Sequence, residues 1–250
     1  MSDATNRPLN LGHRGARGLA PENTLAGMAA GMAAGADGVE FDVQRTADGH
    51  LVVFHDDDLR RICNVSGRIV TSTLAQLREL DAGRYFGPQF AGELIPTLDE
   101  VLETLPANAF VNIEAKRFRF RSDGLEAGIA EAFQRHSLAG RCIVSSFNPV
   151  LLWWLGRIDR TIPLGLLYAP DLPAGLNRGW PRHLLRLAAL HPYQGQVTPK
   201  LVQQARRRGQ QINTWTVNEP AEMRRLIDLG VDGIITDRPD LLSALLAEGD

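Results

Sequence analysis

Two acidic residues lie two positions apart in a stretch that otherwise predicts a buried strand. Glu40 and Asp42 alternate with Val39, Phe41 and Val43. Because successive side chains of a strand point to opposite faces, both carboxylates should lie on one face and the apolar side chains on the other. Unpaired buried carboxylates are strongly disfavoured, so the pair predicts a nearby cation, either a basic side chain or a metal.

A predicted hairpin brings a histidine to these acids. Residues 50–56 form an apolar run that ends in His55 and Asp56, and Asp48-Gly49 precedes it. Asp-Gly supplies the positive φ that a tight reversal needs. Local sequence alone therefore predicts that two carboxylates and one histidine share one neighbourhood.

Glu114 and Lys116 repeat the two-residue spacing on a later predicted strand, so one face of that strand should offer a carboxylate and an ammonium to the same space. In one interpretation Lys116 forms a buried salt bridge with one acid. In the other, three acids against Lys116 and Arg14 leave an excess of negative charge that a divalent cation balances. Three carboxylates without a cysteine favour Mg²⁺ or Ca²⁺ over zinc.

His13 and His55 are the candidate proton carriers, since imidazole titrates near neutral pH. A single histidine is more often structural, but the placement of both beside the acids favours a catalytic role. The remaining histidines are interpreted as structural: His50, His136, His183 and His191.

Composition excludes several classes of protein. The chain has 250 residues, 44% hydrophobic content and a formal charge of −2, which suits a globular protein and gives no basic block for nucleic acid. Cys63 and Cys142 are far apart, which predicts neither a zinc site nor a disulfide framework. We find no signal peptide and no apolar run of the roughly 18 residues that a membrane span needs. We expect a cytoplasmic protein, monomeric or homodimeric, that acts on a small molecule and does not insert stably into membranes.

Eight strand candidates alternate with helices along the chain. The strands are predicted at about 9–12, 38–44, 110–116, 142–147, 163–168, 190–192, 211–217 and 233–236. The helices are predicted at about 24–36, 97–105, 125–136, 149–157, 180–189, 199–208, 221–229 and 241–247. Residues 57–96 interrupt this rhythm and contain one helical segment, Thr71 to Leu80.

This alternation predicts an α/β protein with a parallel sheet, and eight units in this length favour a (β/α)8 TIM-type barrel with a small insertion after strand two. We expect one domain over 1–250, with the insertion at about 57–96. A doubly wound open sheet is the alternative, weakened because no Gly-x-Gly-x-x-Gly follows the first strand. In a barrel the polar residues that interrupt the strands would gather at the carboxyl ends of the strands.

An ordered series of motifs runs from residue 11 to about 240. It comprises His13-Arg14-Gly15, Pro21-Glu22-Asn23-Thr24, Glu40-x-Asp42-Val43, Val53-Phe54-His55-Asp56, Ile95-Pro96-Thr97-Leu98, Asn112-Ile113-Glu114-x-Lys116, Ser145-Ser146-Phe147, Trp215-Thr216-Val217-Asn218 and Gly233-Ile234-Ile235-Thr236-Asp237-Arg238-Pro239. The series resembles that of the glycerophosphodiester phosphodiesterase family. Ala115 is a small departure, because the family more often has a larger apolar residue there.

The resemblance implies a barrel enzyme that hydrolyses glycerophosphodiesters, such as glycerophosphocholine or glycerophosphoethanolamine, to sn-glycerol 3-phosphate and an alcohol. It implies that three carboxylates bind one divalent metal, that two histidines act as acid and base, and that two cations grip the phosphate. The carboxylates are Glu40, Asp42 and Glu114, the histidines are His13 and His55, and the cations are Arg14 and Lys116. Phe147 and Trp215 would contact the glycerol carbons, or else belong to the core.

Two alternatives remain open from the sequence. One is a lyase-like relative, similar to the phosphatidylinositol phospholipase C or sphingomyelinase D groups, or lysophospholipase D-type cleavage of lysophospholipids. It would need an apolar docking loop, for which residues 57–96 offer only Tyr85, Phe86 and Phe90. The other is a barrel that binds phosphorylated ligands without turnover, which would need no acid and base pair.

Overall fold

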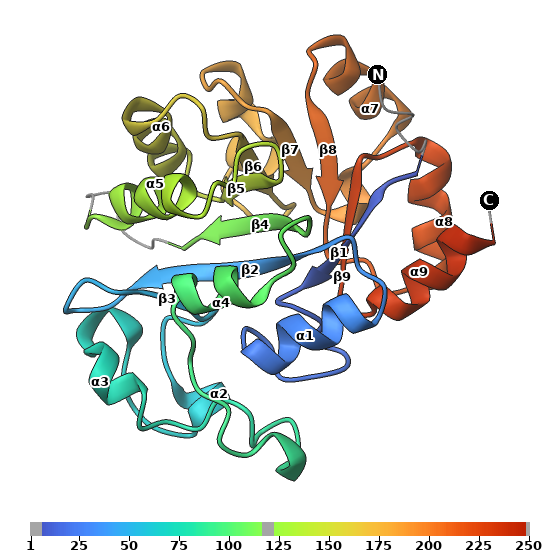
Figure 1. Cartoon of the computed structure of the whole chain (residues 1–250). Helices are drawn as coiled ribbons and strands as arrows, with labels where there is room; N and C mark the ends of the chain where they lie inside the picture. Colours follow the sequence, from blue (N-terminus) through green and yellow to red (C-terminus); the bar gives the residue numbers. More distant parts are fainter. Residues whose placement is uncertain (1–6, 117–122, 249–250) are drawn as a thin grey trace.

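Eight parallel strands close into a barrel in the computed structural model, which describes residues 7–116 and 123–248 (Figure 1). The neighbours around the barrel are β1, β9, β8, β7, β6, β5, β4 and β2, and β2 pairs with β1 to close the ring. Their bounds are Leu9–His13 (β1), Gly38–Arg45 (β2), Phe110–Ala115 (β4), Cys142–Ser146 (β5), Leu164–Tyr168 (β6), Ala189–Pro192 (β7), Gln211–Thr214 (β8) and Gly233–Thr236 (β9). The predicted TIM-type barrel is confirmed.

Helices pack on the outside of this ring (Figure 1). They are α1 (Leu25–Ala33), α4 (Leu98–Thr104), α5 (Leu125–Arg135), α6 (Pro149–Ile158), α7 (Pro199–Arg207), α8 (Pro220–Leu229) and α9 (Pro239–Ala247). Several begin at side chains that cap free backbone N–H groups, such as Thr24 on Gly27 and Asn148 on Val150. No helix among the described residues is long and apolar enough to cross a membrane.

The insertion begins with β3 (Leu51–Val53), which pairs antiparallel with the end of β2. Short elements follow: α2 (Arg60–Cys63), η1 (Ile69–Thr71), α3 (Leu74–Leu77) and η2 (Pro88–Phe90). They project from one side of the barrel (Figure 1) and enclose a separate apolar cluster that includes Phe54, Ile62, Ile69, Leu77 and Ile95. The insertion is therefore packed on its own small core and touches the barrel mouth.

The structure corrects two predicted helices. The helix expected from Trp180 to Ala189 is absent; the connection between β6 and β7 contains the 3-10 turns η3 (Leu176–Arg178) and η4 (Trp180–His183). Leu184 is 69% exposed and Leu187 is buried, so the leucines do not share one helical face. The helix expected over 71–80 is only the single turn α3.

Candidate active site

Three carboxylates meet at the carboxyl ends of β2 and β4. Glu40 and Asp42 lie on β2, and strand register places Asp42 beside Glu114 of β4. One oxygen from each of the three lies within 4.8 Å of the others, and the three side chains are nearly inaccessible to solvent. The structure thus brings together the acids that the two-residue spacing had predicted.

The loop after β1 wraps tightly over this cluster. The backbone N–H of Arg14 donates to Glu40 Oε2 at 3.0 Å, and both Arg14 and Asn23 have positive φ. Gly15 has a φ of 89°, and a Cβ there would lie 2.4 Å from the carbonyl carbon of Gly27, so only glycine fits. Backbone in these sparsely populated regions persists where the surroundings enforce it, as at binding sites.

Two cations partly neutralise the acids. Lys116 Nζ lies 3.1 Å from Asp42 Oδ1 and 2.8 Å from Glu114 Oε1, and Arg14 Nε lies 3.3 Å from Asp42 Oδ2. Asn23 also donates to Asp42, at 2.8 Å. The salt bridge expected of Lys116 is therefore present, and among the described residues Glu40 is left with the backbone N–H of Arg14 and the more distant His13 ring.

The pKa shifts also distinguish Asp42, which both cations contact, from Glu40 and Glu114. Burial alone would raise the pKa of Asp42, but Lys116 and Arg14 bring it below its usual range. Burial, followed by the charges of Asp42 and Glu114, raises the pKa of Glu40 well above the usual value, and burial also raises that of Glu114. A further positive charge beside Glu40 would reverse this shift, so the donor set fits a hard divalent cation.

A cavity of about 20 Å³ lies beside these acids and is lined in part by His13, Glu40, Glu114 and Trp215. A cavity must offer roughly 10–15 Å³ to admit one water. The space therefore suits a single small ligand atom or ion.

His13 is oriented by an acid from the far end of the chain. Its Nδ1 lies 2.6 Å from Asp237 Oδ1, and Asn218 donates to the other Asp237 oxygen at 2.8 Å. Burial lowers the pKa of His13 and the hydrogen bond to Asp237 opposes that effect. With Nδ1 bound to Asp237, Nε2 faces Glu40, 3.9 Å away.

His55 is oriented by the adjacent Asp56, whose Oδ1 lies 2.7 Å from its Nδ1. Arg61 of α2 donates to both oxygens of Asp56 and to both oxygens of Glu22. Glu22 in turn accepts from Arg14 at 2.6 Å. A chain of ionic hydrogen bonds thus links the insertion to His55 on one side and to Arg14 on the other.

Phe147 and Trp215 pack edge to face at the same end of the barrel, with ring centroids 5.3 Å apart. Both are partly exposed. Trp215 lies just after β8, and its Nε1 donates to the carbonyl of His191 at 2.9 Å.

Comparison with known proteins places this geometry in a family. The model of the glycerophosphoryl diester phosphodiesterase family matches residues 13–241. A glycerophosphodiester phosphodiesterase of Caldanaerobacter subterraneus is 41% identical over 247 residues, covering 97% of this chain and 99% of the relative. The chain belongs to the glycerophosphoryl diester phosphodiesterase family. It is a family of hydrolases.

Solved structures agree with the assignment. A phosphodiesterase from Oleispira antarctica, in complex with its product sn-glycerol-3-phosphate, has a TM-score of 0.85 and 30% identity and covers 96% of this chain and 97% of its own. A glycerophosphodiester phosphodiesterase from Thermotoga maritima has a TM-score of 0.76 and 29% identity, with 94% and 96% covered. The barrel and its insertion are therefore shared with phosphodiesterases of this family.

Several residues around this family site received no role from the sequence: Glu22, Asn23, Asp56, Arg61, Asn218 and Asp237. Five of them belong to the motifs His55-Asp56, Pro21-Glu22-Asn23-Thr24, Trp215-Thr216-Val217-Asn218 and Thr236-Asp237, so the signal was present. A histidine at the end of a strand needs an acceptor for its second nitrogen, and these motifs contain the acids. Arg61 gave no such signal, because nothing local connects it to Glu22.

Proposed function

We propose that this chain is a metal-dependent glycerophosphodiester phosphodiesterase, which hydrolyses glycerophosphodiesters to sn-glycerol 3-phosphate and an alcohol. The observation that carries the proposal is the placement of two histidine–aspartate pairs on either side of the three buried carboxylates. Family membership gives the reaction class. The complex of the Oleispira antarctica relative supports glycerol 3-phosphate as the product.

Glu40, Asp42 and Glu114 would bind one divalent cation, Mg²⁺ or Ca²⁺. The support is chemical: oxygen ligands from three carboxylates suit a hard cation, and burial together with the charges of Asp42 and Glu114 raises the pKa of Glu40, which a cation would oppose. Such an ion supplies Lewis-acid stabilisation of a phosphoryl oxygen.

Arg14 and Lys116 would bind the phosphate. Each is buried beside the acids and carries a charge that Asp42 stabilises, because burial alone would lower both pKa values and the neighbouring carboxylates raise them. Guanidinium and ammonium groups offset charge on the phosphoryl oxygens as the bond to the leaving group breaks. Their pairing with Asp42 fixes both groups before substrate arrives.

His13 and His55 would transfer the two protons that hydrolysis requires. One removes the proton from the attacking hydroxyl, whether of water or of the glycerol 2-hydroxyl, and the other gives a proton to the leaving alkoxide. Nδ1 of each ring is occupied by a hydrogen bond to the carboxylate of Asp237 or Asp56, so Nε2 of each is the nitrogen that would meet substrate. Phe147 and Trp215 would contact the glycerol carbons.

Small glycerophosphodiesters suit the site better than lysophospholipids. The aromatic residues of the insertion are committed to contacts within the protein: Tyr85 Oη accepts from the backbone N–H of Glu22 at 3.0 Å, and Phe86 packs edge to face on both Tyr85 and Phe90. Tyr85 is 40% exposed, but these contacts hold all three rings, so they offer less free apolar surface than docking on a lipid would need.

The test is release of glycerol 3-phosphate from glycerophosphocholine and glycerophosphoethanolamine after chelation, and again with Mg²⁺ or Ca²⁺ restored. Glu40→Gln and His13→Ala should abolish most of the release, whereas the matched surface variants Glu103→Gln and His50→Ala should keep it. Glu103 and His50 are exposed side chains outside the site. Full activity in chelator, or in Glu40→Gln, would refute the metal site; no release with either ion would refute the activity.

A further inference from the structure

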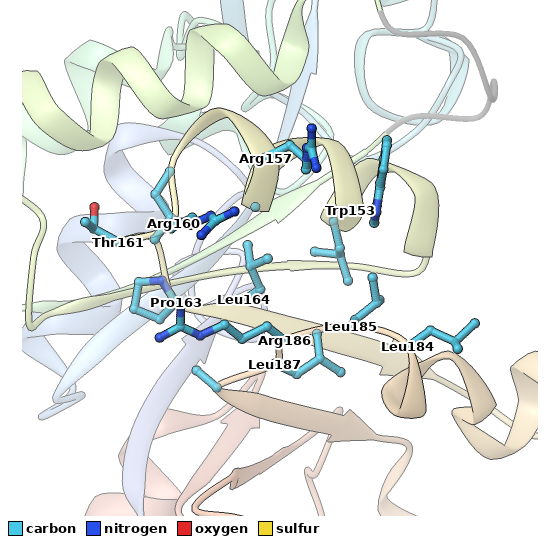
Figure 2. A pocket seen from close by; sticks show the side chains of 14 residues that line it. Trp153, Arg157, Arg160, Thr161, Pro163, Leu164, Leu184, Leu185, Arg186 and Leu187 are labelled. Carbon is cyan, nitrogen blue, oxygen red and sulfur yellow. The ribbon is translucent and has the colours of Figure 1, made fainter.

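A groove of about 540 Å³ lies on the outside of the barrel, between α6 and residues 184–188 (Figure 2). It reaches Leu164 and Ala188, at the amino-terminal ends of β6 and β7. The catalytic residues lie at the carboxyl ends of the strands, so the groove is separate from the active site. Its volume is within the roughly 300–1,000 Å³ typical of ligand pockets.

The groove is open because the connection between β6 and β7 contains no α-helix over its length, all of which the structure describes. Where the other connections lay a helix against the strands, this one leaves apolar side chains facing solvent. Leu152 and Leu164 form a buried floor, while Trp153 is 46% exposed and Leu184 is 69% exposed at the rim. Water in such a groove is readily displaced by a hydrocarbon chain.

Three arginines surround this apolar surface: Arg157, Arg160 and Arg186 (Figure 2). No carboxylate lines the groove. Among the described residues none of the three forms an ion pair, and the one contact recorded is Arg157 over the Trp153 ring at 5.7 Å. Asp159, nearby in sequence, accepts hydrogen bonds from Thr161 and Gln134 and does not line the groove.

The segment that contains the three arginines of the groove is rich in positive charge. Residues 149–188 contain five arginines and two aspartates, with no lysine or glutamate, in a chain whose formal charge is −2. An occupant must therefore be apolar along the floor and anionic at the rim. A second copy docked face to face would bring arginine against arginine, and a flat bilayer would leave the hollow unfilled.

We propose that the groove is a binding site for a single-chain anionic amphiphile, a long-chain fatty acid carboxylate in its dissolved form. The chain lies over Leu152 and Leu164, and the carboxylate lies between the arginines, where charge-assisted hydrogen bonds are strongest. Trp153 and Leu184 cover the chain at the rim.

The chemistry of the active site gives this ligand a source, and this step rests on the proposed function. A glycerophosphodiester arises when two ester bonds of a diacyl phospholipid are hydrolysed, and each hydrolysis consumes one water and releases one fatty acid. The class of reaction that supplies the substrate therefore also supplies the amphiphile. Occupancy of the groove would then depend on the fatty acid that this reaction releases, although the groove is separate from the catalytic residues.

Calorimetric titration of the full chain with dodecanoate, below its micelle concentration, tests the site. We expect saturable binding of one dodecanoate per chain, and none of acetate or dodecyltrimethylammonium. Arg160→Gln and Arg186→Gln should each weaken binding about ten- to a hundredfold, as loss of one charge-assisted contact implies. Leu184→Glu should do the same by adding a negative charge at the rim. Both Arg224→Gln and Leu94→Glu, exposed elsewhere, are the controls.

Three results would overturn the proposal. Dodecanoate heats that do not saturate, or that are unchanged in all three groove variants, exclude the site. Cosedimentation with phosphatidylglycerol vesicles without binding of dissolved dodecanoate assigns the face to a membrane surface instead. A dimer that Leu184→Glu dissociates assigns it to a second copy. None of these measurements depends on hydrolysis, so failure of the proposed function leaves the result interpretable.

Discussion

The two histidine–aspartate pairs reach the same geometry by different routes. His13 and Asp237 are 224 residues apart and meet because β1 and β9 are neighbours in the barrel, with Gly12 opposite Thr236. His55 and Asp56 are adjacent in the sequence. The His13 side chain is 12% exposed and that of His55 is 30% exposed, so the first pair belongs to the barrel wall and the second to its rim.

The difference shows which part of the molecule holds the aspartate partner of each histidine. Closure of the barrel fixes Asp237, with Asn218 holding its second oxygen. Gln44 of β2 donates to the backbone carbonyl of Asp56 at 2.8 Å, but the Asp56 carboxylate is bound by Arg61 of the insertion. The barrel therefore positions the carboxylate that orients His13, whereas the carboxylate that orients His55 is bound by an arginine of the insertion.

If both histidines transfer protons, replacing either one should lower kcat by a similar factor, although the two rings differ in burial. We expect His13→Gln and His55→Gln each to lower kcat about 10²- to 10⁴-fold, the range for loss of a general acid or base. Single-turnover release of glycerol 3-phosphate measures the effect, with His136→Gln as a control outside the site. A loss confined to His13→Gln would show that the pair at the rim is structural.

Removing the carboxylate partner should lower kcat more for the His13 pair than for the His55 pair. We expect Asp237→Asn to lower kcat about 10- to 100-fold, as loss of a residue that orients a catalytic group does. Asp56→Asn should cost less, because the more exposed ring of His55 has water as an alternative acceptor. The pH dependence of kcat/KM in the two variants tests this. Equal losses would mean that burial does not distinguish the pairs.

Arg61 should affect both sides of the site because it binds both Asp56 and Glu22. We expect Arg61→Gln to lower kcat/KM about tenfold, with KM raised as well as kcat lowered, since Glu22 orients Arg14, which we propose binds the phosphate. Arg61→Lys should recover part of the loss but not all, because an ammonium cannot bind two carboxylates in the same fork geometry. Arg224→Gln, exposed on α8 outside the site, is the control, and unchanged kinetics in Arg61→Gln would contradict the linkage.

The sequence predicted those parts of the site that depend on strand periodicity. The two-residue spacing of Glu40 and Asp42, and of Glu114 and Lys116, determines which face each side chain occupies, and parallel pairing then brings the faces together. The barrel itself followed from the alternation of strands and helices. These predictions use local rules that tertiary contacts rarely override.

The parts that the sequence did not predict depend on contacts between distant loops. The link from Arg61 to Glu22 spans 39 residues and joins the helix α2 to the loop after β1, and no local pattern encodes it. The expected helix over 180–189 failed for a related reason: Pro181 and Leu184 follow Gly179 in its left-handed conformation, and burial of Leu187 against the barrel favoured extended chain. The hydrophobic periodicity of the sequence therefore did not predict the groove that the missing helix leaves.

A third histidine shows what the aspartates contribute. His191 is fully buried in the barrel and has no carboxylate partner; its Nε2 lies 3.3 Å from Asn213 Nδ2 and its Nδ1 has no partner among the described residues. Burial lowers its pKa to about 3, so the ring is neutral in the folded protein. As the pH falls below the ordinary value of about 6.5, the unfolded chain takes up a proton that the folded chain cannot, and stability decreases until the pH reaches about 3.

Acid should therefore destabilise the wild type more than His191→Gln, which keeps a polar group of similar reach beside Asn213. Between pH 7 and pH 4.5, we expect the wild type to lose roughly 2–3 kcal/mol more of its unfolding free energy than the variant, at about 1.4 kcal/mol per pH unit below 6.5. Urea unfolding at the two pH values measures this difference, with the exposed His50→Gln as control. Equal losses in the wild type and the variant would mean that His191 takes up its proton in the folded state. A buried histidine would then not need a carboxylate partner to be protonated, and Asp237 would not be what distinguishes His13.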